Sequence, residues 1–405
     1  MQTFDNSLEY TGEFIDVTSD VEVGSVGTIR QKLDNNNFDV GAFRYSDFSF
    51  TIDNTQGKYG EPGVLQSIFT DKRIDSLVKV TWSMNDIDDI NSICGLAIAG
   101  DCYLSDEENV FYGLLNDVAT TQNITDNKLK FSVQGIESIF SKIETNYSAL
   151  SVSDTLSATI YKLLNQTGIT NRVNVAALNI VCGIDQVPDD ISKLENTTVK
   201  ESLDILLEYS NSVLWVDVAT QTVYVKPRTP QATISKTFYG QAANTGSEDV
   251  VSISAITTGA NKTFNYWKWS NSAIISKDVD SISRYGVRKK DISTDIFTNN
   301  TKQLNILTNY KDEFYLPKRE MTLSAILDYS TIDLFIMDRI NVDYPAVLES
   351  ANEADIPRYG IAKYGESVYP VGTWLLTLRT NEHFKIIGRT INFKTGIVDY
   401  NLREV

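Results

Sequence analysis

The chain has 405 residues, of which 42% are hydrophobic and 22% are charged, a composition typical of a globular protein. This length is enough for about two to four packed domains. The formal net charge of −17 disfavours tight binding to nucleic acid, because phosphate contacts need clustered Lys and Arg side chains. The acidic charge fits either simple solubility or an acidic wall along which DNA slides without sticking, and composition does not choose between them.

Cysteine usage and the start of the chain exclude further classes of protein. Cys94, Cys102 and Cys182 are an odd number without CxxC spacing, which favours reduced, partly buried thiols over a metal site or a disulfide framework. The first residues have neither a basic region nor an apolar core, so they do not form a signal peptide. No run approaches the roughly 18 apolar residues of a membrane span. We therefore expect a soluble protein without a membrane span.

The first third of the chain is predicted to be rich in β-strands. Residues 1–40 show no clear hydrophobic period and are typical of an arm or an irregular strand pair. Apolar and polar residues alternate from Phe43 to Ile52, which predicts one half-buried strand. Further strands are predicted at residues 77–82, 110–115 and 129–133. Short strands separated by turn residues indicate an antiparallel barrel or sandwich, so residues 1–148 are predicted to form a barrel-like domain.

Residues 149–229 are predicted to form a small α/β module. A first helix is expected to begin at Ser153 and to end at Gly168, where a left-handed residue is favoured. A second helix is expected to begin at Thr198, because Thr198 and Glu201 have the spacing of a capping box. Alternating residues on both sides of a polar turn then predict a hairpin with strands at 213–216 and 222–226.

Residues 230–405 are predicted to form a second β-rich, barrel-like domain. It contains a helix near 300–315 and a long loop at 345–372. Because this loop is too long for a passive connection, we expect it to be a functional or interface loop. Strands are predicted at residues 251–256, 264–269, 321–325, 334–342, 374–379, 384–393 and 397–402. The predicted fold class is therefore mainly β, with two antiparallel barrel-like domains joined by an α/β module.

Signatures of catalysis are absent from the sequence, which contains no GxSxG, P-loop, GxGxxG or HExxH motif. The single histidine, His383, lies between two predicted strands and is expected to be an exposed turn residue. Two acidic clusters lie in polar loops without the apolar setting that would raise a carboxyl pKa, namely Asp86, Asp88 and Asp89, and Asp106, Glu107 and Glu108. We therefore expect a protein that is not an enzyme, with no catalytic, cofactor-binding or metal-binding residues.

Four segments resemble the baseplate or tail-tip hub proteins of tailed phages, a family whose fold is shared with the hub part of the type VI secretion spike. They are FRYSDFSFTIDNTQGKY at Phe43–Tyr59, TVKESLDILLEYSNSVLWVD at Thr198–Asp217, SISRYGVRKKDI at Ser281–Ile292 and FKIIGRTINFKTGIVDYNLREV at Phe384–Val405. The last segment is the most informative, since such hubs often end in two strands separated by a turn similar to Lys-Thr-Gly.

This resemblance implies a structural virion protein, made in the host cytoplasm and located at the tail tip or baseplate. Three chains would place six barrels in a ring, joining a sixfold tail tube to a threefold tip and forming part of the DNA conduit. The implied partners are two further copies of the chain, a tail tube or distal tail protein, a tape-measure protein, and a central spike or fibre. DNA would be present only in transit.

Two other classes of function remain open on the sequence alone. One is a tail-associated cell-wall hydrolase or carbohydrate-binding protein, for which Trp267 and Trp269 would line an exposed groove beside a carboxylate pair. The other is a β-rich surface adhesin. Aromatic residues at alternate positions are more typical of a core than of a platform that stacks sugars.

Overall fold

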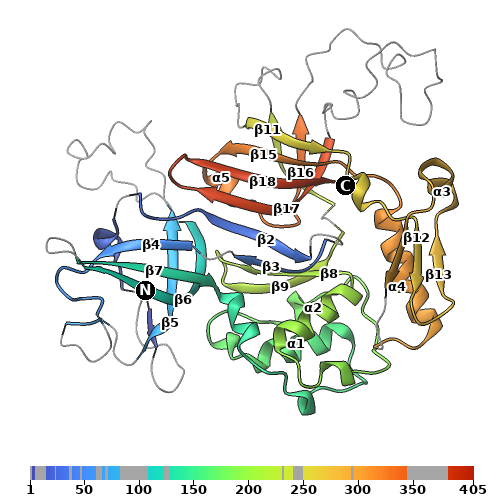
Figure 1. Cartoon of the computed structure of the whole chain (residues 1–405), viewed down its shortest axis with the longest axis horizontal. Coiled ribbons are helices and arrows are strands. Elements are labelled where there is room, and N and C mark those ends of the chain that lie inside the picture. The colour runs from blue at the N-terminus through green and yellow to red at the C-terminus, as the bar shows by residue number, and fades with distance from the viewer. Residues whose placement is uncertain are drawn as a thin grey trace, which may run out of the picture.

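The structure of the protein is a computed structural model that is mainly β with a few helices, which confirms the predicted fold class (Figure 1). The residues that the structure describes are 2–4, 15–22, 24–35, 39–45, 48–60, 66–68, 72–82, 108–122, 127–229, 232–239, 250–292, 296–343 and 382–405. Within them the strands form a five-stranded, a ten-stranded and a three-stranded sheet.

The five-stranded sheet lies at the N-terminal end of the molecule and has the order β1-β5-β6-β7-β4. Its strands are β1 (Gln2–Phe4), β5 (Lys72–Trp82), β6 (Glu108–Gln122), β7 (Asn127–Gly135) and β4 (Phe48–Asp53). Buried aromatic rings on alternate strand positions form its core, with the ring centroids of Phe48 and Phe111 4.6 Å apart. This packing has the edge-to-face geometry that aromatic pairs prefer.

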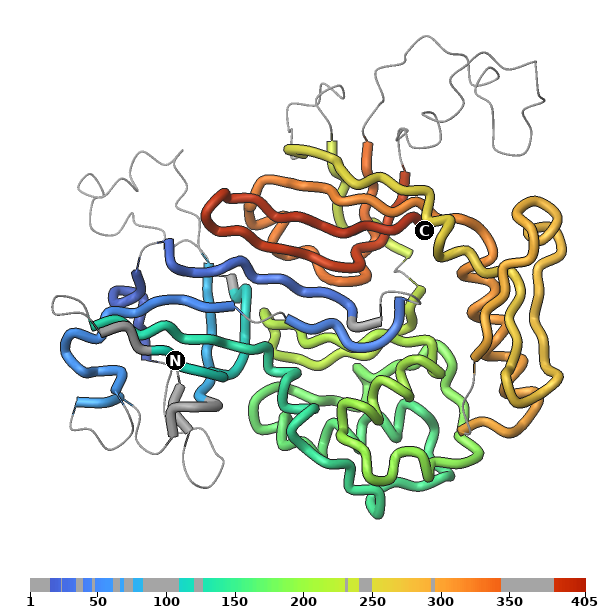
Figure 2. The backbone as a smooth tube through the Cα atoms, in the orientation of Figure 1, coloured from blue at the N-terminus to red at the C-terminus, as the bar shows by residue number. Residues whose placement is uncertain are grey.

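The ten-stranded sheet runs through the centre of the molecule in the order β11-β15-β18-β17-β2-β3-β8-β9, with β16 and β10 branching from β17 as part of a half-barrel. Its strands are β2 (Ile29–Asn35), β3 (Val40–Tyr45), β8 (Ser212–Asp217), β9 (Thr222–Pro227), β10 (Ile234–Tyr239), β11 (Val250–Thr257), β15 (Glu320–Ile326), β16 (Arg339–Asp343), β17 (Glu382–Asn392) and β18 (Ile397–Glu404). Figure 2 shows the first and last parts of the chain side by side in it.

The single strand predicted from Phe43 to Ile52 is wrong. This segment contributes to two strands in different sheets, because β3 ends at Tyr45 and pairs with β2 and β8, whereas β4 begins at Phe48 and pairs with β7. An alternating pattern reports which side chains are buried and carries no information on the partner strand.

Residues 1–40 contain an ordered central strand, β2, where the sequence shows no clear period. Ile29, Gln31 and Leu33 are all buried, so a glutamine occupies one of the inward positions and hides the alternation. β2 pairs antiparallel with β17, with Ile29 opposite Ile391. N-terminal residues therefore pair directly with a strand from the C-terminal end of the chain, in a sheet that also contains strands from its middle.

The middle module contains the two predicted helices, α1 (Leu156–Gln166) and α2 (Val199–Tyr209). α1 is capped by Thr155, so it begins three residues after the predicted start at Ser153. α2 has the predicted capping box between Thr198 and Glu201. Short 3-10 helices lie at η1 (Thr18–Asp20), η3 (Ile136–Ser141), η4 (Tyr147–Ala149), η5 (Ile169–Asn171), η6 (Ala177–Asn179), η7 (Ser192–Leu194) and η9 (Ala260–Lys262).

Replacing Thr198 with alanine is expected to lower the free energy of unfolding by about 1 kcal/mol, because the first amides of α2 lose the hydroxyl that accepts from Glu201 N at 3.2 Å. Chemical denaturation monitored by circular dichroism measures this change. Thr198→Ser keeps the hydroxyl and serves as the control. A Thr198→Ala variant as stable as the wild type would show that the cap contributes nothing to α2.

A small α/β lobe is inserted between β11 and β15, which pair with each other, and it lies at the right of Figure 1. Its elements are β12 (Tyr266–Trp269), β13 (Ile275–Lys277), β14 (Lys289–Ile292), α3 (Val279–Tyr285) and α4 (Asn300–Phe314), and α5 (Tyr329–Ile332) follows β15. The helix expected near 300–315 is present as α4, whose N-cap is Asn299.

The lobe packs against the middle module. The Asp189 carboxylate accepts hydrogen bonds of 2.8 Å from the backbone N–H groups of Thr298 and Asn299, just before α4. The Tyr310 hydroxyl donates to the Glu208 carbonyl at 2.7 Å, at the end of α2. These bonds join the start of α4 to the middle module and the body of α4 to the end of α2.

Two further expectations have different outcomes. The strand predicted at 334–342 is shorter, because β16 begins only at Arg339, after Met337 adopts a left-handed φ of 69°. The loop at 345–372 and the strand at 374–379 lie outside the described residues.

Candidate functional site: a buried ionic cluster

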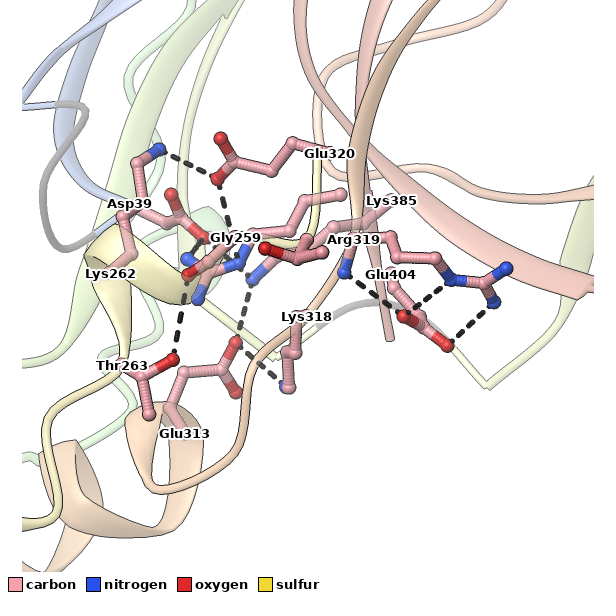
Figure 3. A network of polar contacts seen from close by, with 12 residues as sticks. Asp39, Gly259, Lys262, Thr263, Glu313, Lys318, Arg319, Glu320, Lys385 and Glu404 are labelled. Atoms are coloured by element: carbon pink, nitrogen blue, oxygen red, sulfur yellow. Dashed lines mark hydrogen bonds and ion pairs between the residues drawn. The ribbon is translucent and has the colours of Figure 1, made fainter. Parts of the chain in front are cut away.

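A group of charged side chains is buried where the N-terminal strands, the lobe and the C-terminal hairpin meet (Figure 3). Lys385 of β17 and Arg403 of β18 are direct neighbours across the two strands. Each is 1% exposed, and both form ion pairs with Asp39, which is 0% exposed. The Asp39 carboxylate lies 3.3 Å from Lys385 Nζ and also accepts a hydrogen bond from Arg403.

Two glutamates extend this ionic cluster into the lobe. The Glu313 carboxylate, near the end of α4, lies 3.1 Å from Lys385 Nζ and 3.1 Å from Lys318 Nζ. Glu320, at the start of β15, lies 2.7 Å from Lys262 Nζ. The carboxylates therefore each contact a cation from a different segment of the chain.

Arg319 forms the outer edge of the cluster. Its guanidinium lies 2.8 Å from the Glu382 carboxylate and 2.9 Å from the Glu404 carboxylate. The Arg319 backbone N–H also donates to Glu404 at 3.0 Å. These bonds attach the segment before β15 to the first residue of β17 and to the end of β18.

Aromatic rings of α4 cover the arginines of the cluster. The Arg403 guanidinium lies 4.6 Å from the Phe314 ring centroid. The guanidinium of Arg228, which follows β9, lies 4.9 Å from the Tyr310 ring centroid and 4.9 Å from that of Phe314. Stacking of this kind stabilises a guanidinium that has lost its water.

The charges of the cluster determine the ionisation of its carboxylates. Burial raises the pKa of Asp39, but the nearby Lys385 and Arg403 outweigh burial and hold this pKa below its ordinary value. The pKa of Glu313 is also lowered, since Lys385 and Arg228 together outweigh its burial. Both side chains stay ionised at neutral pH, so the cluster is suited to joining segments of the chain and not to donating protons.

Gly259 allows the lobe to approach the cluster closely. Its φ is 62°, and a Cβ atom built there would lie 1.8 Å from the Lys318 carbonyl oxygen. The short helix η9, which begins at the next residue, carries Lys262 to Glu320. Only glycine combines this backbone conformation with this contact.

Acid is expected to weaken the ionic cluster, because its carboxylates Asp39 and Glu313 become protonated. Because their pKa values are lowered on folding, their stabilisation is present above the unfolded-state pKa of roughly 4 and declines as pH falls through the folded-state values. Denaturation of the wild type and an Asp39→Asn variant from pH 7 to pH 2.5 measures this effect. The difference in unfolding free energy should shrink below about pH 4. A constant difference over this range would contradict the assigned ionisation.

This cluster was not predicted from the sequence. Asp39 lies in the region without a hydrophobic period, and its partners are more than three hundred residues away in the chain. The one available signal was the presence of Lys385 and Arg403 within strands that are otherwise apolar, because lysine and arginine are almost never fully buried unless they are paired.

Of the histidine, the cysteines and the acidic clusters singled out in the sequence, the residues that the structure describes are not members of the ionic cluster. His383 is a half-buried residue of β17 opposite Asn341, so its assignment to an exposed turn is wrong, because the strand begins one residue earlier. Cys182 is a free, buried thiol, whereas Cys94 and Cys102 lie outside the described residues. The same holds for Asp86, Asp88, Asp89, Asp106 and Glu107, and Glu108 is the first residue of β6.

Trp267 and Trp269 belong to the core of the lobe. They are 0% and 1% exposed, and the Trp267 ring stacks on Tyr310 with centroids 5.1 Å apart. The suggestion that they line an exposed groove for sugars is therefore wrong. In the part of the chain that the structure describes, no helix is long and apolar enough to cross a membrane, and no group of His, Cys, Asp and Glu side chains is arranged to hold a metal ion.

Comparison with solved structures finds proteins of similar fold. The tail protein from Neisseria meningitidis MC58 matches with a TM-score of 0.54 and 12% sequence identity, covering 95% of this chain and 95% of that chain. The 43 kDa tail protein of prophage MuSo2 from Shewanella oneidensis matches with a TM-score of 0.52 and 11% identity, covering 95% of this chain and 96% of that chain. This chain has the fold of phage tail proteins. The resemblance stated from the sequence is thus confirmed at the level of the fold.

No protein-family model and no curated protein matches the sequence. At 11% and 12% identity, a chain can retain the arrangement of strands while most side chains differ. Both neighbours are tail proteins, and at this level of identity the match establishes the fold of this chain.

Proposed function

We propose that this protein is a structural component of a phage virion and forms the trimeric hub of a tail tip or baseplate. The observation that carries this proposal is the fold match to two phage tail proteins over 95% of this chain and at least 95% of each neighbour. The match includes the β-rich parts, the middle module and the lobe, so it does not depend on one common subdomain.

In this proposal, residues 1–148 and 230–405 supply the two barrel-like domains, and the module at 149–229 joins them, with β2, β3, β8 and β9 paired into the central sheet. Three chains would form a ring that connects a sixfold tail tube to a threefold tip, with a tape-measure protein and a central spike or fibre as further partners. The ionic cluster supports this role, because it holds segments of both β-rich parts at fixed positions without a flexible linker. A rigid adaptor needs such fixed geometry and large interfaces more than convergent titratable groups.

The net charge of −17 is compatible with a wall along which DNA passes without being held. The hydrolase or sugar-binding alternative required Trp267 and Trp269 to line an exposed groove, and both side chains are buried.

Electron microscopy of the purified protein tests the proposal. Class averages should show a ring with threefold symmetry and a central opening. Particles that stay compact and asymmetric, both alone and after mixing with a tail tube protein of the same phage, would contradict the hub. Release of reducing sugars from host wall material would instead favour a hydrolase.

A further inference from the structure

One face of the ten-stranded sheet carries the ionic cluster at one end and is open to solvent at the other. The strand register places Lys385 beside Arg403, and Thr390 beside both Asp399 and Arg30, on this same face. Side chains at alternate strand positions share a face. We call it the outer face, and its open end consists of Arg30, Lys32, Thr322, Ser324, Thr390, Asp399 and Asn401.

Arg30 and Lys32 form an exposed basic pair on β2. Among the residues that the structure describes, no carboxylate forms an ion pair with either of them. Arg44, on the neighbouring strand, differs, because its guanidinium lies 3.7 Å from Asp204 of α2. The remaining positions are mainly neutral hydroxyls and amides, and Asp399 already accepts a 2.6 Å hydrogen bond from Ser324.

At the end of the outer face that carries the ionic cluster, the cations bind carboxylates. There, Lys385 and Arg403 are paired with Asp39, which adjoins β3, and Lys385 is also paired with Glu313 of α4. Cations on this face are thus neutralised by carboxylates, one from the residue that precedes β3 and one from α4 of the lobe, which lies outside the sheet. Arg30 and Lys32 continue the same surface without such a cover.

We propose that the open end of the outer face docks an acidic surface of a second copy of this chain, with carboxylates of that copy pairing with Arg30 and Lys32. Charge complementarity supports this occupant, since the chain carries a net charge of −17 and this basic pair is a local exception. Double-stranded DNA is a poorer fit, because two cations neutralise few phosphates.

The charge also determines the type of contact. A contact that brought the basic pair of one copy against that of its partner would place like charges together, which is unfavourable. In the proposed threefold ring the contact is heterologous, with the basic pair of one copy against a different surface of the next, and such contacts form a ring when the rotation between copies closes. This inference rests on the proposed ring and identifies one of its contact surfaces.

Charge reversal in the full-length chain tests the inference. Self-association of the wild type and an Arg30→Glu/Lys32→Glu variant is measured by sedimentation velocity over a range of concentrations and salt. The variant should associate at least about tenfold more weakly, and added salt should weaken the association of the wild type. Lys130→Glu/Lys277→Glu is the matched control, because it reverses two exposed lysines on other sheets. Circular dichroism verifies that each variant is folded.

Three results would overturn the inference. If the wild type self-associates and the Arg30→Glu/Lys32→Glu variant self-associates equally strongly, this surface is excluded and the proposed hub is left intact. A wild type that stays monomeric at every concentration would overturn both. Binding of a double-stranded DNA fragment that is lost only in the Arg30→Glu/Lys32→Glu variant would assign the basic pair to nucleic acid and not to a second copy.

Discussion

Replacing Asp39 with alanine is expected to lower the free energy of unfolding by about 3–5 kcal/mol, because Lys385 and Arg403 are then buried without their shared carboxylate. An uncompensated buried charge is among the most costly defects in a protein interior. The loss should appear in chemical denaturation as a lower midpoint. Since Asp39 precedes β3 and its partners lie in β17 and β18, the variant should also be cleaved more readily near residue 39 in limited proteolysis.

Two control variants isolate this effect. Asp291→Ala removes an exposed ion pair with Lys289 and should leave stability almost unchanged. Asp39→Asn keeps the size of the side chain and loses only the charge, so it should be destabilising as well. An Asp39→Ala protein with the stability of the wild type would show that the cluster does not hold these segments together.

Replacing Trp267 with alanine is expected to lower the free energy of unfolding by about 3–5 kcal/mol, since it opens a cavity in the core of the lobe. The ring packs between Tyr310 and Phe264, and its Nε1–H donates to the Phe264 carbonyl at 2.9 Å. Trp267→Phe preserves part of the packing and should cost less. Leu304→Ala, on the exposed side of α4, is the control with little expected effect.

Denaturation and a sugar-binding assay together decide the role of Trp267. A Trp267→Ala variant that keeps its stability but loses binding to host wall sugars would restore the platform that the structure excludes. Loss of stability with unchanged sugar binding is the result that the buried ring predicts.

Local features of the fold could be predicted from the sequence. The capping box of Thr198 and Glu201 acts within one turn of helix, so its spacing alone predicted the start of α2. The hairpin of β8 and β9 is formed by neighbouring residues and was predicted for the same reason. The switch between sheets after Tyr45 could not be predicted, because it depends on which distant strands pair with β3 and β4.

The ionic cluster could not be predicted from the sequence for a related reason. Asp39 and Arg403 are brought together only when β2 and β3 join the C-terminal hairpin in one sheet. No spacing in the sequence records a contact across that distance. The tail-protein resemblance was nevertheless visible, because it relied on several short patterns in the correct order and not on any single long-range contact.

The mass of the purified protein in solution tests the trimeric hub most directly. Light scattering should give about three times the chain mass of 45.3 kDa, that is about 136 kDa, and the value should persist on dilution. A particle that keeps the mass of a single chain at high concentration and low salt would contradict the account.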